Sequence, residues 1–104
     1  MAFRDHRYYV YIVASRTRVL YIGITNSVKR RMAQHREKVF PGFTAHYNCE
    51  RLVYFESYQY VYNALDREKQ LKRWSRAKKI ELIERLNPSW DDLSDAWWTQ
   101  VQQG

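Results

Sequence analysis

The sequence predicts a small α+β domain with the element order ββαβαα. Two runs rich in β-branched and aromatic residues lie on either side of a short polar segment near the N-terminus, which is typical of a β-hairpin. Further along, three stretches show helix caps or apolar residues at helical spacing, and one short strand-like run lies among them. The chain has 104 residues, of which 45% are hydrophobic, so we expect one domain spanning residues 1–104.

The hairpin is predicted from Tyr8 to Val13 and from Val19 to Ile24, with the polar turn Ser15-Arg16-Thr17-Arg18 between them. Successive side chains of a strand point to opposite faces. One face of the first strand then carries Tyr9, Tyr11 and Val13, and one face of the second carries Val19, Tyr21 and Gly23. The hairpin therefore presents several tyrosines together on one side.

Capping residues and breakers place the first helix and the segment after it. Thr25-Asn26-Ser27 offers caps for a helix from Val28 to Lys38. Phe40-Pro41-Gly42 ends that helix, and the stretch to Asn48 is predicted to be a loop. A third strand is expected from Leu52 to Glu56.

Two further helices complete the predicted domain. Ser57 is expected to cap a helix that runs to about Trp74, and Ser75 to cap another from about Arg76 to Leu86. Asn87-Pro88 ends the last helix, since a residue before proline avoids helical geometry. The apolar stripe of the last helix comprises Ile80, Ile83 and Leu86, and the side chains expected to fold back on the core are Trp90, Leu93, Trp97 and Trp98.

The charge of the chain favours a polyanionic partner. The formal net charge is +7, and the sequence pI is about 9.7. The basic residues are clustered: Arg67, Lys69, Lys72, Arg73, Arg76, Lys78 and Lys79 lie in one stretch, and Lys29, Arg30, Arg31, Arg36 and Lys38 in another. Such clusters are the expected footprint of phosphate binding, although a merely basic, soluble surface is the alternative.

Cysteine content and hydropathy exclude other classes of protein. Cys49 is the only cysteine, so neither a disulfide framework nor a cysteine-based zinc site is possible. The first residues do not resemble a signal peptide, and no apolar run approaches 18 residues. We therefore expect a cytoplasmic protein without a membrane partner.

Two predicted helices carry charged residues on an apolar side. Glu68 lies in the apolar stripe formed by Val61, Ala64, Leu65 and Leu71. A carboxylate in that position is costly unless it is paired or bound to a cation, and both readings stay open. On the first helix, Arg31 and His35 lie one turn apart beside Met32, either as a solvated edge or as a phosphate clamp.

These residues occur together with an ordered set of motifs. The first motif is Tyr9-Val10-Tyr11, and a second, Tyr21-Ile22-Gly23, begins ten residues after Tyr11. Arg31 and His35 come next, followed by an Arg-Glu-Lys-Gln-Leu-Lys-x-Trp motif at residues 67–74. The set resembles the GIY-YIG nuclease family, in particular its small stand-alone, URI-domain-like bacterial members. The resemblance covers about residues 8–93. It departs from the family at Tyr9, which replaces the glycine of the first motif.

The resemblance implies a three-stranded antiparallel sheet flanked by helices, and one Mg²⁺ or Mn²⁺ ion held by Glu68 and waters. It implies that Arg31 holds the scissile phosphate and that His35 orients a tyrosine or the attacking water. Tyr11 is favoured as the general base with Tyr21 as its partner, although the sequence leaves the choice open. Because a free tyrosine has a pKa near ~10, either one needs help from positive charge. Gly23 and Asn87 are possible accessory residues, and His46 is a weaker candidate.

The implied function is a divalent-metal-dependent endonuclease, with DNA favoured over RNA as substrate. Backbone phosphates would be bound by Lys29, Arg30, Lys69, Lys72, Arg73 and Arg76, without sequence readout. The alternative is a nucleic-acid-binding module of the same fold that is weakly active or inactive. The protein is expected to be a monomer or a weak homo-oligomer, with tryptophans near the C-terminus as a possible interface.

Overall fold

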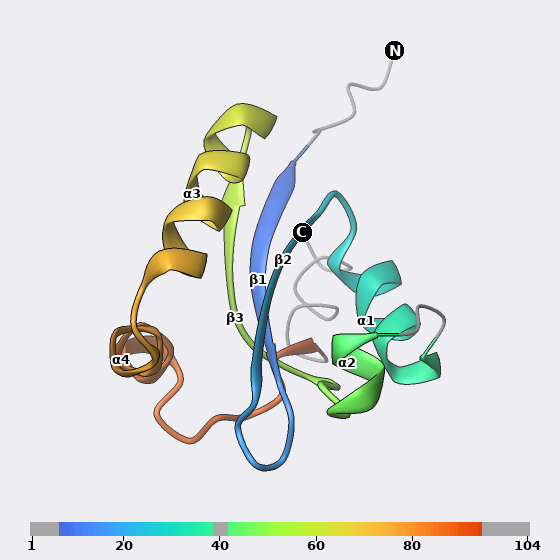
Figure 1. Cartoon of the computed structure of the whole chain (residues 1–104). Coiled ribbons are helices and arrows are strands. Elements are labelled where there is room, and N and C mark those ends of the chain that lie inside the picture. The colour runs from blue at the N-terminus through green and yellow to red at the C-terminus, as the bar shows by residue number, and fades with distance from the viewer. Residues whose placement is uncertain (1–6, 39–41, 95–104) are drawn as a thin grey trace.

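The computed structural model describes residues 7–38 and 42–94, and a three-stranded sheet lies at its centre (Figure 1). Its strands are β1 (Tyr8–Ala14), β2 (Leu20–Thr25) and β3 (Arg51–Tyr58). They are antiparallel and arranged in the order β2-β1-β3, so β1 is the central strand. The predicted hairpin and the α+β class are confirmed.

The register of the sheet decides which side chains meet. Tyr11 lies opposite Gly23 of β2 and opposite Phe55 of β3. A bulge between Ile12 and Val13 shifts the pairing with β3. The tyrosine-bearing face of the hairpin is therefore continuous across all three strands, as the alternation of the sequence predicts.

Two helices begin at the predicted caps. Helix α1 (Val28–Glu37) begins after Ser27, whose hydroxyl accepts a hydrogen bond from the backbone N–H of Arg30. Helix α4 (Arg76–Leu86) begins after Ser75 in the same way and ends at Asn87, as predicted. Lys38 is not part of α1, because its left-handed backbone (φ 53°) ends the helix.

Two other elements differ from the prediction. The segment predicted to be a loop up to Asn48 contains a short helix, α2 (Phe43–His46), a single turn in which apolar periodicity cannot develop. Helix α3 (Val61–Arg73) begins after Tyr60, so the prediction that Ser57 caps it is wrong. Ser57 lies within β3, opposite Tyr9, because pairing with β1 extends that strand to Tyr58.

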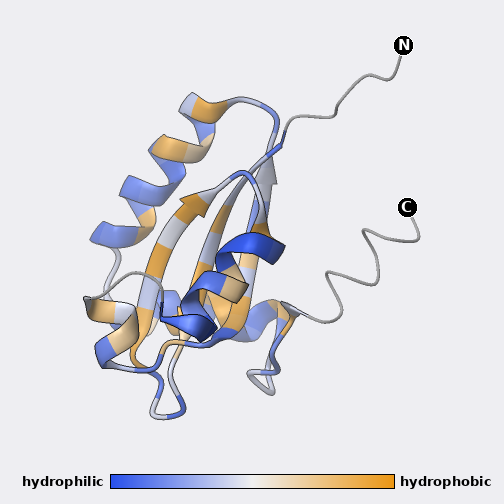
Figure 2. Ribbon diagram, turned by 90° about the vertical axis from the view of Figure 1, so that its right-hand side faces the viewer, coloured by the Kyte–Doolittle hydropathy of each residue, from blue (hydrophilic) through white to orange (hydrophobic). Residues whose placement is uncertain are grey.

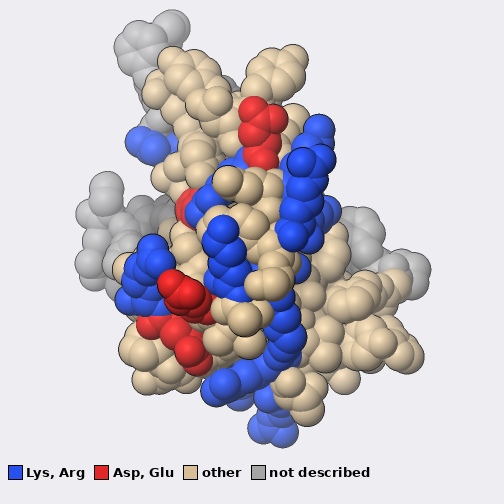
Figure 3. Space-filling view, turned by 60° about the vertical axis from the view of Figure 1, so that its left-hand side comes forward, with Lys and Arg blue, Asp and Glu red and all other residues tan. Residues whose placement is uncertain are grey.

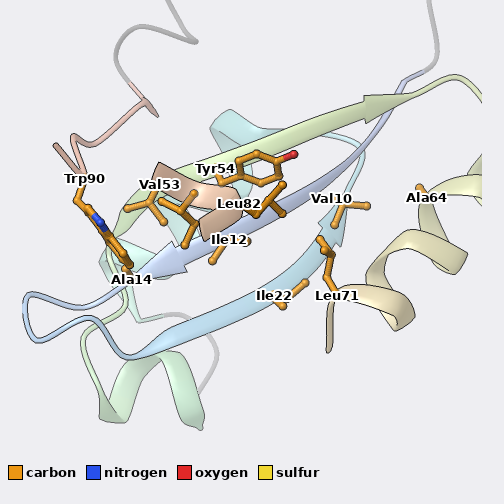
Figure 4. Packing of buried hydrophobic residues seen from close by; sticks show 11 residues of the cluster. Val10, Ile12, Ala14, Ile22, Val53, Tyr54, Ala64, Leu71, Leu82 and Trp90 are labelled. Carbon is orange, nitrogen blue, oxygen red and sulfur yellow. The ribbon is translucent and has the colours of Figure 1, made fainter. Parts of the chain in front are cut away.

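The helices cover the two faces of the sheet. Helices α3 and α4 lie on one side, and α1 and α2 on the other (Figure 1). Their apolar residues face the strands and their polar residues face outward (Figure 2). The core on the α3–α4 side includes Val10, Ile12, Ala14, Ile22, Val53, Tyr54, Ala64, Leu71, Leu82, Ile83 and Trp90 (Figure 4). The core on the α1 side includes Tyr11, Val13, Val28, Met32, Cys49 and Leu52.

The predicted apolar stripe of α4 is only partly right. Ile83 is buried and Ile80 packs against the core, but Leu86 is exposed, and Leu82 is buried in its place. Leu86 is the last residue of α4, directly before the Asn87 that ends the helix. No helix among residues 7–38 and 42–94 is long and apolar enough to cross a membrane.

The chain after α4 folds back on the core, as predicted for Trp90 and Leu93, and meets the start of β3. Trp90 is buried, and the backbone N–H of Leu93 donates to the carbonyl of Leu52 at 2.7 Å. The Asp92 carboxylate accepts from the N–H of Leu52 at 3.2 Å. The expectation for Trp97 and Trp98 concerns positions outside the described residues.

A polar network ties α3 to β3. Arg67 Nη2 is 2.9 Å from Oε2 of Glu56, and Arg67 Nε is 2.9 Å from Oε1, which makes a forked pair. The hydroxyls of Tyr54 and Tyr58 also donate to Glu56. Burial alone would raise the pKa of Glu56, but the bonds from Arg67 and the two tyrosines outweigh it and hold the pKa below its usual value. The ionised carboxylate therefore fixes α3 against the sheet.

Replacing Glu56 by Gln is expected to lower the free energy of unfolding by about 1.5–3 kcal/mol at pH 7, as is typical of hydrogen bonds to a charged group. Because the pKa of Glu56 is lowered in the folded state, its contribution is present above the unfolded pKa of about 4.3 and is lost as pH falls through the folded value. Urea denaturation at pH 7 and pH 3 tests this: the deficit of the variant should shrink at pH 3. Glu81→Gln, in an exposed pair with Arg85, is the matched control. Equal stability of the two variants at pH 7 would contradict the assignment.

Candidate active site

Tyr11 and His35 form the buried centre of the site. Tyr11 lies on the central strand, and its hydroxyl oxygen is 3.1 Å from Nε2 of His35 on α1. The other ring nitrogen of His35, Nδ1, is 3.2 Å from the hydroxyl oxygen of Thr44 on α2. Strand β1 and the two helices on one face of the sheet therefore each contribute one residue to a chain of hydrogen bonds.

The protonation states follow from burial and charge. Burial lowers the pKa of His35, and the neighbouring positive charge of Arg31 lowers it further, so the ring is neutral at pH 7. Burial raises the pKa of Tyr11 well above its ordinary value, more than the opposing effect of Arg31. Tyr11 therefore donates to Nε2 of His35, and Nδ1 of His35 donates to Thr44.

Gly23 is required by the position of the Tyr11 side chain. The Tyr11 ring extends across β2, and a β-carbon at residue 23 would clash with the Tyr11 hydroxyl and the adjoining ring carbons. Glycine is thus needed here because it lets the Tyr11 ring lie close to the β2 backbone, and not because of an unusual backbone angle. Gly23 accordingly leaves room for the Tyr11 hydroxyl.

Tyr21 lies beside the Tyr11–His35 pair and is less buried. Its ring centroid is 6.0 Å from that of His35 in an edge-on arrangement, and 6.1 Å from that of Phe43 on α2. Its negative charge, if ionised, would raise the pKa of Tyr11. The two tyrosines named by the sequence motifs are thus close enough to share one histidine.

Arg31 and Glu68 reach this centre from opposite layers of the fold. Arg31, one turn before His35 on α1, affects the pKa of both Tyr11 and His35. Glu68 comes from α3 on the other side of the sheet, and its negative charge raises the pKa of Tyr11. A hydrogen bond from His35 and the charges of Arg31, Tyr21 and Glu68 thus connect the other four residues of the predicted set to Tyr11.

Glu68 has the features expected both of a residue in an ion pair and of a residue that binds a cation. Its side chain is 15% exposed, and its Oε2 lies 3.7 Å from Nζ of Lys72, one turn further along α3. That separation exceeds a normal hydrogen-bond distance, and the Lys72 side chain is itself 52% exposed. The pair is therefore loose, and a small part of the Glu68 side chain remains exposed to solvent.

The donor set at Glu68 suits one kind of metal. No group of three or more His, Cys, Asp or Glu side chains within the described part of the chain could enclose an ion. Mg²⁺ is commonly bound by one or two carboxylates with several retained waters and substrate phosphates. A single, partly exposed carboxylate beside a predicted phosphate site fits that pattern.

Several other predicted residues lie away from this centre. Asn87 is buried. Its amide nitrogen donates to the carbonyls of Val53 and Asp91, and its amide oxygen accepts from the N–H of Asp91, so its role is structural. His46 is exposed and packs edge-on against Tyr47. Arg30 on α1 donates to Asn26 at 2.9 Å.

The predicted phosphate-binding residues lie mainly on the α3–α4 side of the molecule. Figure 3 views that side, and Lys and Arg side chains form a band along it. The exposed predicted residues there are Lys69, Lys72, Arg73 and Arg76, and those on α1 are Lys29 and Arg30. A band of this kind makes the surface potential there positive, which favours attraction of a polyanion.

Sequence reasoning missed two residues at the site. Thr44 and Phe43 were assigned to a loop without a role, yet one bonds His35 and the other lies beside Tyr21. Neither belongs to a periodic pattern, because α2 is a single turn. Only the folded arrangement reveals them.

The comparison with protein families addresses the same stretch of chain. The model of the GIY-YIG catalytic domain matches residues 7–81, which include every residue of the centre described above. The chain belongs to the GIY-YIG family. Tyr9 stands where the first motif of the family has glycine, and the second motif, Tyr21-Ile22-Gly23, is intact.

Relatives in the GIY-YIG family are small proteins of bacteria and archaea. A UPF0213 protein from Haloquadratum walsbyi is 36% identical over 77 residues, covering 74% of this chain and 86% of the relative. A UPF0213 protein from Staphylococcus haemolyticus is 35% identical over 78 residues, covering 75% of this chain and 95% of the relative. The NMR structure of a UPF0213 protein from Bacillus halodurans matches with a TM-score of 0.55 at 26% identity, covering 85% of this chain and 94% of that one.

Proposed function

We propose that this GIY-YIG protein is a divalent-metal-dependent endonuclease that hydrolyses phosphodiester bonds in nucleic acid, with DNA favoured over RNA. The observation that supports this most is the convergence of a histidine, a second tyrosine, an arginine and a glutamate around the hydroxyl of Tyr11. Such a set contains a proton acceptor, a phosphate ligand and a cation ligand. The basic band beside it supplies the attraction for a polyanion.

Proton transfer is assigned to Tyr11 and His35 acting together. A buried tyrosine with a raised pKa is a poor base alone, but its proton has an acceptor in neutral His35. As the attacking water gives a proton to the Tyr11 oxygen, Tyr11 passes its own proton to Nε2 of His35. Thr44 keeps the ring in the tautomer that can accept it.

Charge stabilisation is assigned to Arg31 and Glu68. The planar guanidinium of Arg31 suits two phosphate oxygens at once. Glu68 would hold Mg²⁺ or Mn²⁺, and such a cation supplies stabilisation of the leaving oxygen and of the transition-state charge. Because the two side chains come from opposite layers, the phosphate would be held between them.

A binding module without turnover is the second candidate. Tyr9, in place of the motif glycine, packs beside Tyr11 and fills space on the tyrosine-bearing face. Cleavage assays on single- and double-stranded DNA and RNA, with Mg²⁺ or Mn²⁺ against EDTA, separate the two candidates. We expect cleavage in either metal and none in EDTA. Binding without metal-dependent cleavage on all four substrates would instead establish the module.

The cleavage rate is expected to fall in acid with a midpoint below pH 6.5. Burial and Arg31 lower the pKa of His35, so its neutral, proton-accepting form persists below pH 6.5 and is lost as pH falls through the lowered value. The profile of kcat/KM against pH should therefore show one acid limb, which His35→Gln should remove along with most of the rate. Folding stability should also decline from pH 6.5 downward, because the unfolded chain takes up the proton first. An acid limb centred above pH 6.5 would contradict the role of His35.

The other expectations concern assembly and location. We propose a monomer or a weak homo-oligomer in the cytoplasm, with no membrane partner. Light scattering over a range of protein concentrations tests the oligomeric state.

A further inference from the structure

A hollow of about 310 Å³ follows the outer edge of β2, next to Tyr21. It is lined by Leu20, Tyr21, Ile22, Phe43, Lys72 and Lys79. Its volume is at the small end of the range of about 300–1,000 Å³ typical of small-ligand pockets. Because α2 contributes from one face of the sheet and α3 and α4 from the other, the hollow joins the two layers that carry the candidate active site.

One wall of the hollow is aromatic and exposed. Phe43 is 47% exposed, and its ring is inclined by 32° to that of Tyr21. The ring centroid of Tyr47 is 4.8 Å from that of Phe43, and Tyr47 is 44% exposed. Three rings thus run outward from the candidate active site, and two of them leave large apolar surfaces to solvent. Exposed aromatic rings of this kind can serve as platforms on which nucleic-acid bases stack.

The opposite rim of the hollow is positively charged. Lys72 lies one turn after Glu68 on α3, and Lys79 lies on α4. Among the described residues no acidic side chain lines the hollow, and the carboxylate paired with this rim is that of Glu68, 3.7 Å from Nζ of Lys72. A ligand that fits both walls combines a flat apolar face with neighbouring negative charge, which is the chemistry of a nucleobase attached to phosphates.

We propose that this hollow binds an unpaired nucleobase adjacent to the phosphate at the active site. The base stacks on Phe43, Tyr47 extends the stacking surface to the next base, and Lys72 and Lys79 bind the intervening backbone. The bases of an intact duplex are paired and stacked, so they present no free face to this wall. The inference rests on the proposed function and specifies its substrate: nucleic acid with a single-stranded segment at the cleavage site.

Binding in metal-free buffer tests this without depending on cleavage. Fluorescence anisotropy would compare a labelled oligodeoxythymidylate with a duplex of equal length at fixed salt. We expect the single strand to bind more tightly. Phe43→Ala should weaken single-strand binding by about 5- to 150-fold, the range for loss of one base–aromatic stack, and leave duplex binding nearly unchanged. Tyr62→Ala is the matched control, because Tyr62 is an exposed aromatic residue on α3 outside the hollow.

A second measurement separates stacking from general damage. An oligonucleotide containing 2-aminopurine should lose fluorescence on binding to the wild type, and should not do so with Phe43→Ala. Lys79→Ala should reduce the slope of log affinity against log salt by about 0.7 for a single strand. Thermal melts of each variant should match the wild type, since these side chains are largely outside the core.

The outcomes are distinct. Phe43→Ala binding both ligands like the wild type would overturn the base site, and so would equal affinity for single strand and duplex. Both results leave the proposed nuclease intact. Failure of the wild type to bind any of the nucleic acids would overturn the proposed function together with the inference.

Discussion

Replacing Glu68 by Gln is expected to reduce metal-dependent cleavage by at least about 10³-fold, while nucleic-acid affinity in metal-free buffer stays nearly unchanged. Glutamine keeps the shape of the side chain but loses the charge that would hold the cation. A cation contributes several kcal/mol of transition-state stabilisation, and each 1.36 kcal/mol is a factor of ten. Initial rates with Mg²⁺ and with Mn²⁺ measure the effect.

Metal binding gives this prediction a readout besides activity. Mn²⁺ should raise the Tm of the wild type and should raise it less in Glu68→Gln, because a ligand stabilises only the state that binds it. Glu81→Gln, on the exposed side of α4, should behave like the wild type in both assays. Cleavage by Glu68→Gln at the wild-type rate would eliminate Glu68 as the cation ligand.

Arg31→Ala is expected to lower kcat by about 10²–10³-fold, the usual loss when a preorganised donor to a developing negative charge is removed. Arg31→Lys should recover only part of the rate, since an ammonium lacks the two-pronged geometry of guanidinium. The reduction should appear chiefly in kcat, because the many other basic residues on the surface would still hold the substrate backbone. Single-turnover rates at saturating enzyme isolate the chemical step.

The same variant should change the titration of His35. The Arg31 charge contributes to the lowered pKa of His35, so Arg31→Ala should move that pKa upward. NMR titration of the imidazole reports this shift without any substrate. Arg30→Ala, one position earlier on the solvent side of α1, should lose some affinity and leave the His35 titration alone. An unmoved His35 titration in Arg31→Ala would refute the assigned proximity.

Local rules were enough to predict most of the framework. Alternation along the two hairpin strands placed Tyr11, Tyr21 and Gly23 on one face, and the register confirms it. Ser27 and Ser75 were identified as caps from the sequence alone, since serine is a preferred residue at the start of a helix. In the structure each hydroxyl accepts a hydrogen bond from the backbone N–H three residues further on. The family motifs then named Tyr11 and the four residues that are linked to it by a hydrogen bond or by charge.

The missed features depend on contacts between distant segments. Ser57 looked like a helix cap, but the pairing of β3 with β1 extends the strand past it. The forked bond between Glu56 and Arg67 joins a strand to a helix, and no local pattern encodes it. The hollow beside Tyr21 combines α2, β2, α3 and α4, so its existence is a property of the folded chain.

The outer position of β2 has a consequence for assembly. Within the described residues β2 pairs only with β1, so its other edge is turned toward the hollow and toward the lysines of α3 and α4. Lysines beside an edge strand discourage it from recruiting a foreign strand. If a partner polypeptide did add a strand there, it would fill the hollow between the two helical layers and block the binding of nucleic acid. A peptide that adds a strand at β2 would therefore compete with nucleic acid for the hollow, whereas one that pairs along β3 would leave the hollow open.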